Sequence, residues 1–318
     1  MSSIKIAEAR KIILEKIQSQ GTEKVSINEA LGRILSEDII ARRNNPPMDN
    51  SAMDGYALIA KDIELATPET PVKLDIIEDL AAGYSPEMTI QPGQAVRIMT
   101  GAPIPEGADA VIMQEDTERN GNSVQVKDKA EVRENIRDAG EDVREGETVI
   151  RKGADLMPAH IGMMAVVGRS TALVGRRPQV AVLSTGDEVM DLDEPLSGPC
   201  IYNSNGYMLA AQIKSAGGIP SYLGIARDNE KDLMEKFKWA LQCDMVVSSG
   251  GVSVGDYDLV KTSLKKMGQE MLFWKVAMKP GKPLAFGRID DVPIFGLPGN
   301  PVSSFVSFQQ FVRPSVRK

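Results

Sequence analysis

Histidine and cysteine are almost absent from this sequence, and their scarcity narrows the chemistry that the protein can perform. His160 is the single histidine, which removes the usual Ser/His/Asp triads and histidine metal sites. It follows Pro158 on an apolar stretch, where we interpret it as a structural residue. The two cysteines, Cys200 and Cys243, form no CxxC pair, so neither a disulfide framework nor a zinc site is expected. Any chemistry must use carboxylates, lysines, hydroxyls and backbone amides.

The sequence also lacks an excess of positive charge and any long apolar run. Its 37 basic and 44 acidic residues give a net charge of −7, whereas a general nucleic-acid binder needs a basic face to displace counterions from phosphates. No stretch of about 20 apolar residues occurs, so no membrane span is expected. The N-terminus lacks the basic start and apolar core of a signal peptide. We therefore predict a cytoplasmic protein that binds neither nucleic acid nor membranes.

The first half of the chain changes character several times. Residues 4–19 carry apolar side chains at helical spacing and predict an amphipathic helix. The run 41–58, rich in Pro, Asn, Asp and Met, predicts an ordered loop. Short apolar runs separated by turns predict a small sheet or barrel over residues 72–132. Residues 156–167 predict a helix that starts at Pro158, and we expect it to pack beside the first helix.

Strands and helices alternate from Pro178 onward, which indicates an α/β domain. The predicted strands with their turns lie in residues 178–188, 220–229 and 243–258, and the predicted helices in 204–218, 230–242 and 258–268. We expect the first of these helices to be capped by Ser204 or Asn205 and to end at Gly217. The alternation predicts a doubly wound parallel sheet with helices on both faces. Ligands of such sheets bind at the carboxyl ends of the strands.

Each predicted strand end carries glycine or polar turn residues together with a carboxylate. In chain order, the loop residues are Thr185, Gly186 and Glu188, then Asp228, and then Ser249, Gly250, Gly251, Ser253 and Asp258. Glycine lets backbone N–H groups approach a phosphate closely, and carboxylates are the oxygen ligands that Mg²⁺ prefers. Taken together, the loops predict a phosphorylated ligand with Mg²⁺. Any one loop alone is better explained as a helix cap or a tight turn.

A basic segment follows these loops. Residues 273–288 contain four basic side chains and no acidic one, namely Lys275, Lys279, Lys282 and Arg288. Prolines and a glycine restrict this segment, so it predicts a local positive field for an anion, with a solvated basic surface as the alternative. The turn at Pro298 and Pro301 precedes a helix that we expect to begin at about Val302, and a helix N-terminus can hold an anion. A plain proline-rich turn is the alternative there.

Eight motifs together resemble a known family. In chain order they are PPMDNSAMDGYAL, RIMTGAPIPEGADAVIMQE, NIRDAGEDVREGE, VLSTGDEV, YNSNGYML, SSGGVSVGDYD, KPGKPLAFG and FGLPGNPVSS. On these motifs the chain resembles the molybdopterin molybdenumtransferase family (molybdenum cofactor biosynthesis protein MoeA), whose eukaryotic relative is the E domain of gephyrin. The match extends from the first helix to Pro314, which is nearly the whole chain.

The resemblance implies an enzyme, specifically a transferase. It implies that adenylylated molybdopterin and molybdate are the substrates, that Mg²⁺ participates, and that molybdenum cofactor and AMP are released. It also implies an elongated homodimer in which the loop 44–58 lies over the crevice of the other subunit. The expected partners are the small-molecule pterin and molybdate, with the molybdopterin adenylyltransferase of the preceding step as a further candidate.

The resemblance further implies three domains. Domain I comprises residues 1–48 and 139–176 and is helix-rich and dimerising; domain II, residues 49–138, is a small β insertion. Domain III, residues 177–318, carries the catalytic loops and resembles the molybdopterin adenylyltransferase fold. Family members usually continue into a fourth domain, a small β-barrel, which we expect to be absent because the sequence ends at Lys318.

Individual roles carry over to matching positions. The expected catalytic residues are Asp54, Thr100, Asp142, Glu188, Asp228, Asp258, Lys275 and Lys279. The expected substrate-binding residues are Thr185, Gly186, Ser249, Gly250, Gly251, Ser253, Pro298 and Pro301. Glu188, Asp228 and Asp258 are expected to hold Mg²⁺ or its waters, and the lysines to neutralise molybdate and the charge that develops on the departing AMP.

Two alternative functions stay open. One is a scaffold or binding protein of the same fold with little catalytic activity, as the gephyrin relative partly is through its binding of receptors. The retained set of acidic and lysine positions argues against that function. The other is the molybdopterin adenylyltransferase itself, which shares the domain III fold but has no need of domains I and II.

Overall fold

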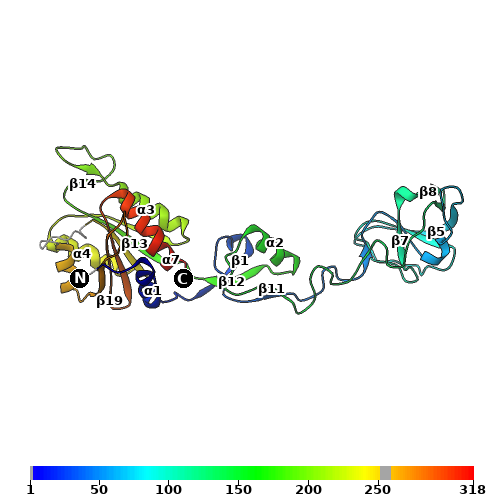
Figure 1. Cartoon of the computed structure of the whole chain (residues 1–318), viewed down its shortest axis with the longest axis horizontal. Helices are drawn as coiled ribbons and strands as arrows, with labels where there is room; N and C mark the ends of the chain where they lie inside the picture. The colour runs from blue at the N-terminus through cyan, green and yellow to red at the C-terminus, as the bar shows by residue number, and fades with distance from the viewer. Residues whose placement is uncertain (1–2, 251–258) are drawn as a thin grey trace. The chain divides into compact units, whose positions relative to one another are not determined.

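The computed structural model describes residues 3–250 and 259–318, and the chain divides into two compact units (Figure 1). The first unit combines Met1–Ser36 with Thr171–Lys318, and the second is Glu37–Ser170. Three predicted site residues, Gly251, Ser253 and Asp258, lie outside the described residues. The division into three domains stays a prediction.

A six-stranded sheet forms the centre of the first unit. Its strands, in spatial order, are β16 (Ile219–Ala226), β13 (Gln179–Thr185), β17 (Met245–Ser249), β20 (Val292–Leu297), β19 (Pro283–Ile289) and β18 (Glu270–Lys275). The three predicted strands, β16, β13 and β17, are parallel as expected, and β20, which was not predicted, is parallel to β17. The sheet is nevertheless mixed, because β19, which was not predicted, is antiparallel to both of its neighbours. Only Asp290 and Asp291 separate β19 from β20. A two-residue turn can join two strands only if they are antiparallel.

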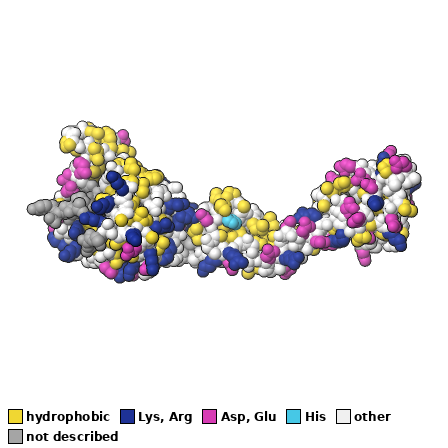
Figure 2. Space-filling model, viewed as in Figure 1, with side chains coloured by type: hydrophobic (Ala, Val, Ile, Leu, Met, Phe, Trp, Pro, Cys, Tyr) yellow, Lys and Arg dark blue, Asp and Glu magenta, His cyan; other side chains and the backbone are white. Residues whose placement is uncertain are grey.

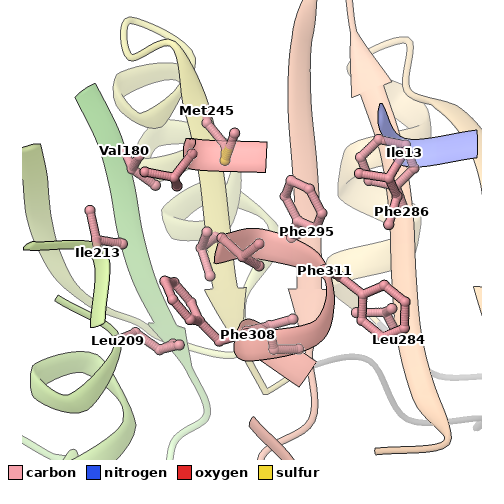
Figure 3. Packing of buried hydrophobic residues seen from close by; sticks show 14 of the residues in the cluster. Ile13, Val180, Leu209, Ile213, Met245, Leu284, Phe286, Phe295, Phe308 and Phe311 are labelled. Atoms are coloured by element: carbon pink, nitrogen blue, oxygen red, sulfur yellow. The ribbon is translucent and has the colours of Figure 1, made fainter. Parts of the chain in front are cut away.

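Helices cover both faces of this sheet, as the alternating pattern predicted. The helical segments of the unit are α1 (Ile6–Lys16), α3 (Ser204–Ser215), α4 (Glu230–Ala240), α5 (Leu259–Lys266), α6 (Pro301–Ser307), the π-helical η4 (Phe308–Val312) and α7 (Arg313–Val316). On one face, residues of α1, α3, η4 and α7 pack on the sheet around Phe286, Phe295 and Phe308 (Figure 3). On the other face, α4 and α5 pack through Phe237 and Leu264.

The first helix packs against the C-terminal helices of its own unit. Its buried residues Ala9 and Ile13 lie in the same core as Phe311 and Val316, so the apolar stripe of α1 faces η4 and α7. The helix expected beside it, α2 (Pro158–Val166), belongs to the second unit. The expected pairing of the two helices stays a prediction. Helical periodicity shows that a face is buried but not which surface buries it.

Two small sheets complete the first unit. β1 (Thr22–Ser26) pairs antiparallel with β12 (Thr171–Gly175), and β14 (Val189–Met190) pairs parallel with β15 (Ile201–Tyr202). A short 3-10 helix, η1 (Ile27–Glu29), follows β1. The segment between β14 and β15 projects from the sheet edge, where Figure 1 labels β14.

The second unit is built on a separate sheet, as the short apolar runs predicted. Its six strands, in spatial order, are β7 (Ala110–Met113), β4 (Gly55–Leu58), β6 (Gln94–Ile98), β5 (Val72–Leu80), β9 (Ser123–Val126) and β8 (Thr117–Asn120). The unit also contains smaller elements, namely β2 (Ile39–Ile40), β3 (Asn50–Ser51), β10 (Ile136–Arg137), β11 (Thr148–Ile150), α2, η2 (Ala60–Ile63) and η3 (Gln114–Asp116). Both faces of the sheet are buried, one around Leu58 and Leu74 and the other around Leu80 and Ile98.

His160 has the structural role that its position indicated. Its Nδ1 accepts a hydrogen bond from the backbone N–H of Met157 at 3.0 Å, which satisfies an N–H at the start of α2. Cys200 and Cys243 are both free thiols. Across residues 3–250 and 259–318, no helix is long and apolar enough to cross a membrane.

Candidate functional site

The strand directions bring the predicted loops to one edge of the sheet in the first unit. Because β13, β16, β17 and β20 are parallel, the loops that follow them leave from the same edge. β18 runs in the same direction as β20, since two antiparallel steps separate them, so the β18–β19 loop lies at this edge as well. The predicted site residues at this edge are Thr185, Gly186, Glu188, Asp228, Ser249, Gly250, Lys275, Lys279, Pro298 and Pro301.

A pocket of about 80 Å³ opens among these loops. It is lined by Ser184, Thr185, Glu188, Val189, Ile201, Tyr202, Asn203, Ser204, Asn205, Ser249, Gly250, Gly299 and Pro301. Asn203 and Asn300 cap the N-termini of α3 and α6, and residues of both helix starts line the pocket. Helix N-termini carry unsatisfied N–H groups and a partial positive charge, so this wall favours a negatively charged ligand group.

Asn205 presents an unsatisfied acceptor at this pocket. Its Nδ2 donates to Ser249 Oγ at 2.7 Å and to the carbonyl oxygen of Gly299 at 2.8 Å. A carbonyl oxygen only accepts, so the amide orientation is fixed and Oδ1 faces away from Gly299. Asn205 Oδ1 and Thr185 Oγ1 are both buried and have no hydrogen-bond partner among the described residues. Buried polar atoms are nearly always paired, so a polar ligand group would complete both.

Acidic side chains gather beside the pocket. The backbone N–H of Asp228 donates to Asp187 Oδ1 at 3.0 Å, which ties the loop after β16 to the loop after β13. Desolvation raises the pKa of Asp228; a hydrogen bond from the backbone of Asp187 opposes this, and the negative charges of Asp187 and Glu188 add to it. Carboxylates that repel one another in this way form a site at which a cation would be favoured. Within the described part of the chain, no group of three or more His, Cys, Asp or Glu side chains has the arrangement of a metal site.

Lysines supply the opposite charge at the same edge. Lys275 ends β18 and is partly buried, and Lys279 lies exposed in the following loop. Neither makes a salt bridge with a residue that the structure describes. Their charges are therefore available to an anionic ligand, and a solvated basic surface stays the alternative.

Three predicted catalytic residues lie in the second unit. Asp54 precedes β4 and accepts hydrogen bonds from the backbone N–H and the hydroxyl of Thr100, each at 2.8 Å. These bonds lower the pKa of Asp54. Asp142 accepts from Arg137 at 2.7 Å and from Asn45 Nδ2 at 3.3 Å. Within their unit these carboxylates are thus held by local partners, and their catalytic roles stay predictions.

Sequence reasoning missed three residues of the site. Ser204 or Asn205 was expected to cap α3, but the N-cap is Asn203, whose Oδ1 accepts from the N–H of Gly206 at 3.0 Å. Asn205 instead binds Ser249 and Gly299. Arg227, which lies in the predicted turn after the second strand but was given no role, donates to the carbonyl oxygen of Val189 at 3.0 Å and braces the start of β14. The signal for the asparagines was present in the YNSNG motif, but it did not assign their roles.

The first unit thus contains an α/β domain of the class that binds ligands at the carboxyl edge of a parallel sheet. Two family models match the chain: residues 4–168 match the MoeA N-terminal region (domain I and II), and residues 181–318 match a probable molybdopterin binding domain. The chain belongs to the MoeA, or molybdopterin molybdenumtransferase, family.

Individual relatives agree with this assignment. The chain is 39% identical over 318 residues to "Molybdopterin molybdenumtransferase 2" of Mycobacterium tuberculosis, covering 98% of this chain and 78% of the relative. It is 40% identical over 306 residues to the molybdopterin molybdenumtransferase of Bacillus subtilis, covering 94% of this chain and 71% of the relative. The solved molybdopterin biosynthesis moeA protein of Pyrococcus horikoshii OT3 superposes with a TM-score of 0.86 at 33% identity, covering 100% of this chain and 79% of that chain.

Proposed function

We propose that this protein inserts molybdenum into molybdopterin. The observation that carries the proposal is the convergence of Thr185, Glu188, Asp228 and Lys275 at one sheet edge of a chain that belongs to the molybdenumtransferase family. The pocket wall built from two helix N-termini supports an anionic ligand. The free acceptor of Asn205 supports a ligand that also carries N–H or O–H donors, as a pterin ring does.

We further propose that the substrates are adenylylated molybdopterin and molybdate, and that AMP leaves. Lys275 and Lys279 would bind molybdate and stabilise the negative charge that develops on the departing AMP. Asn205 and Thr185 would orient the ligand through their unsatisfied oxygens, and the walls of the pocket would exclude bulk water from the bond that breaks. Each of these roles follows from the charge or the hydrogen-bonding capacity of the group.

The carboxylates at this edge fit a magnesium ion. Mg²⁺ in phosphate-binding sites takes one or two protein carboxylates and completes its shell with waters and substrate phosphates. Glu188 and Asp228 would supply such a pair, and a cation there would offset the desolvation and, after it, the carboxylate repulsion that raise the pKa of Asp228. Mg²⁺ held there would neutralise part of the charge on the phosphate bridge of the substrate. Asp258, the third expected ligand, lies outside the described residues.

We also propose that the active form is a homodimer in which Asp54, Thr100 and Asp142 serve the site of the other subunit. The support is family membership, since all three residues lie in the segment that matches the MoeA N-terminal region. An isologous dimer would then contain two equivalent composite sites.

The test is direct. The purified protein is incubated with adenylylated molybdopterin, molybdate and Mg²⁺, and AMP release is followed by chromatography. Glu188→Ala and Asp228→Ala should each reduce molybdate-dependent AMP release by at least about a hundredfold, as expected for loss of a group that stabilises developing charge. Glu235→Ala, on the exposed side of α4, is the matched control and should behave as wild type.

The circular dichroism spectra of all variants must match that of the wild-type protein. Wild-type turnover in both Glu188→Ala and Asp228→Ala would remove these carboxylates from the mechanism. Absence of molybdate-dependent AMP release from the wild-type protein would contradict the proposed function itself.

A further inference from the structure

The segment between β14 and β15 lacks a core of its own. We call residues 191–200 the flap; none of them is buried. Leu192 and Leu196 are exposed, and Figure 2 shows hydrophobic side chains on the surface over this part of the first unit. Segments with few buried apolar contacts open locally at low free-energy cost. Burial therefore cannot hold the flap in place, and polar contacts must do so.

The base of the flap forms part of the pocket. Val189, Ile201 and Tyr202 line the pocket and belong to β14 and β15, the two short strands that carry the flap. The backbone N–H of Ile201 donates to the carbonyl oxygen of Glu188, and that of Asn203 to the carbonyl oxygen of Met190, both at 2.9 Å. Movement of the flap would therefore displace one wall of the pocket.

Asp191 connects the flap to two other elements through tyrosines. Its Oδ1 accepts a hydrogen bond from the hydroxyl of Tyr207, on α3, at 2.7 Å. The hydroxyl of Tyr222, on β16, lies 3.4 Å from both carboxylate oxygens of Asp191. The two tyrosine rings are in contact, with centroids 5.1 Å apart. Three segments that are separate in the sequence thus meet at one carboxylate.

The direction of these hydrogen bonds is fixed by Asn203. Its Oδ1 accepts from the N–H of Gly206, which only donates, and from Ser184 Oγ at 2.7 Å. Its Nδ2 must therefore face Tyr222, and it donates to that hydroxyl at 2.8 Å. The Tyr222 hydroxyl oxygen therefore accepts from Asn203. The hydroxyl proton of Tyr222 is then free to be donated to Asp191. The network joins the flap to the N-cap of α3, and so to the wall of the pocket.

The protonation states suit this network. The hydrogen bond from Tyr207 holds the pKa of Asp191 below its usual range, so the carboxylate is ionised at neutral pH. Burial and the nearby charge of Asp191 raise the pKa of Tyr222, and the hydrogen bond to Asp191 raises that of Tyr207. Both phenols therefore keep the protons that they donate.

We propose that Asp191, Tyr207 and Tyr222 form a clasp that holds the flap against α3 and β16 and thereby positions the pocket wall at Val189, Ile201 and Tyr202 for the substrate. The clasp residues are positioning residues, since they act through the wall and not on the reacting atoms. The effect on the substrate rests on the proposed molybdenum transfer, whereas the mechanical effect on the flap does not.

The experiment compares Tyr207→Phe and Asp191→Asn with two controls, Asp193→Asn and Tyr84→Phe. Tyr207→Phe removes only a hydroxyl from a half-exposed ring, so the fold should persist. Asp193→Asn removes the same charge two positions along the flap, at a residue with φ +66° that asparagine tolerates. Tyr84 is exposed and lies in the second unit.

Hydrogen–deuterium exchange at the Ile201 and Asn203 amides reports the flap without any ligand. In both clasp variants exchange should be about tenfold faster, as expected for loss of a hydrogen bond to a charged acceptor. The KM for adenylylated molybdopterin should rise by about tenfold with kcat changed less than about threefold, because the wall contributes to binding in ground and transition states alike. The Asp191→Asn/Tyr207→Phe double variant should be no worse than the more affected single variant.

Unchanged exchange in both clasp variants would overturn the clasp. Faster exchange with an unchanged KM would reject its role in positioning the substrate. If the wild-type protein released no AMP, the proposed function would fail, and the exchange comparison alone would still decide whether the clasp exists.

Discussion

Thr100 donates two hydrogen bonds to a single carboxylate oxygen of Asp54, one from its backbone N–H and one from its hydroxyl, each at 2.8 Å. Both bonds favour the ionised form, so they lower the pKa of Asp54. A carboxyl whose pKa is lower in the folded than in the unfolded state stabilises the fold above the unfolded pKa of about 3.9, and that stabilisation is lost as the pH falls through the folded pKa.

Thr100→Val should raise the pKa of Asp54 toward about 3.9, because the hydroxyl donor is lost while the backbone donor remains. Carbon-detected NMR titration of the carboxyl group measures this change. Thr67→Val is the control, since the Thr67 hydroxyl contacts Thr70 and no carboxylate. An Asp54 pKa that is the same in Thr100→Val and in wild type would show that the hydroxyl bond does not contribute.

Mixing two inactive variants tests the composite site. If Asp54 serves the other subunit, a heterodimer of Asp54→Asn and Asp228→Ala contains one site with both defects and one with neither. Random pairing makes about half of the dimers mixed, so activity should recover to about a quarter of wild type. Mass spectrometry of the mixture confirms that subunits exchanged. No recovery after confirmed exchange would mean that both residues serve the same chain.

The lysines at the sheet edge should bind the anion in a salt-dependent way. Lys275→Ala and Lys279→Ala should each weaken molybdate binding by roughly three- to tenfold at low salt. The loss should shrink as salt rises, because partly exposed charges are screened beyond about 8 Å at physiological ionic strength. Titration calorimetry at two salt concentrations measures both effects. Lys214→Ala, on the last turn of α3 at the opposite edge, should leave the affinity unchanged.

Gly250 should resist substitution more strongly than a glycine of similar conformation. A Cβ at Gly250, with φ +90°, would lie 2.7 Å from the carbonyl oxygen of Thr185, whereas at Gly217, with φ +94°, nothing lies within 4 Å. Gly217→Ala should cost about 1 kcal/mol of unfolding free energy, and Gly250→Ala about 2–4 kcal/mol. Urea unfolding followed by tryptophan fluorescence measures both, since Trp239 and Trp274 lie in the first unit. Equal losses would show that the loop relaxes around the added methyl group.

The aromatic core beneath η4 should dominate the stability of the first unit. Phe308 is fully buried, so Phe308→Ala should lower the unfolding free energy by about 3–5 kcal/mol through lost burial and the resulting cavity. Phe305, one helical turn earlier, is 45% exposed, and Phe305→Ala should cost about 1 kcal/mol or less. The same fluorescence measurement applies. A small effect of Phe308→Ala would mean that the core collapses into the vacated space.

Much of the fold could be predicted because the local pattern of apolar residues and turn residues indicates the strands and helices. The apolar strands that end in Thr185 and Ser249 are short, continuous and bounded by glycine turns, and the helices between them have clear periodicity. Parallel pairing then placed Glu188 and Asp228 at one edge without any knowledge of contacts. The positions of the site loops at this edge could be predicted because the order of strands and helices along the chain determines how the strands are connected.

The partners of each face and each polar group follow instead from contacts between distant segments. Apolar spacing in α1 predicted a buried stripe, but the choice of η4 and α7 as its partners depends on shape complementarity across 300 residues of chain. The YNSNG motif suggested Ser204 or Asn205 as the cap of α3, but Asn203 has that role, and Ser184 and Tyr222 satisfy its remaining polar atoms. The clasp at Asp191 has no local signature, since its three side chains come from a loop, a helix and a strand. Such hydrogen bonds form between residues that are far apart in the sequence. They depend on the three-dimensional positions of donor and acceptor, which no short stretch of sequence specifies.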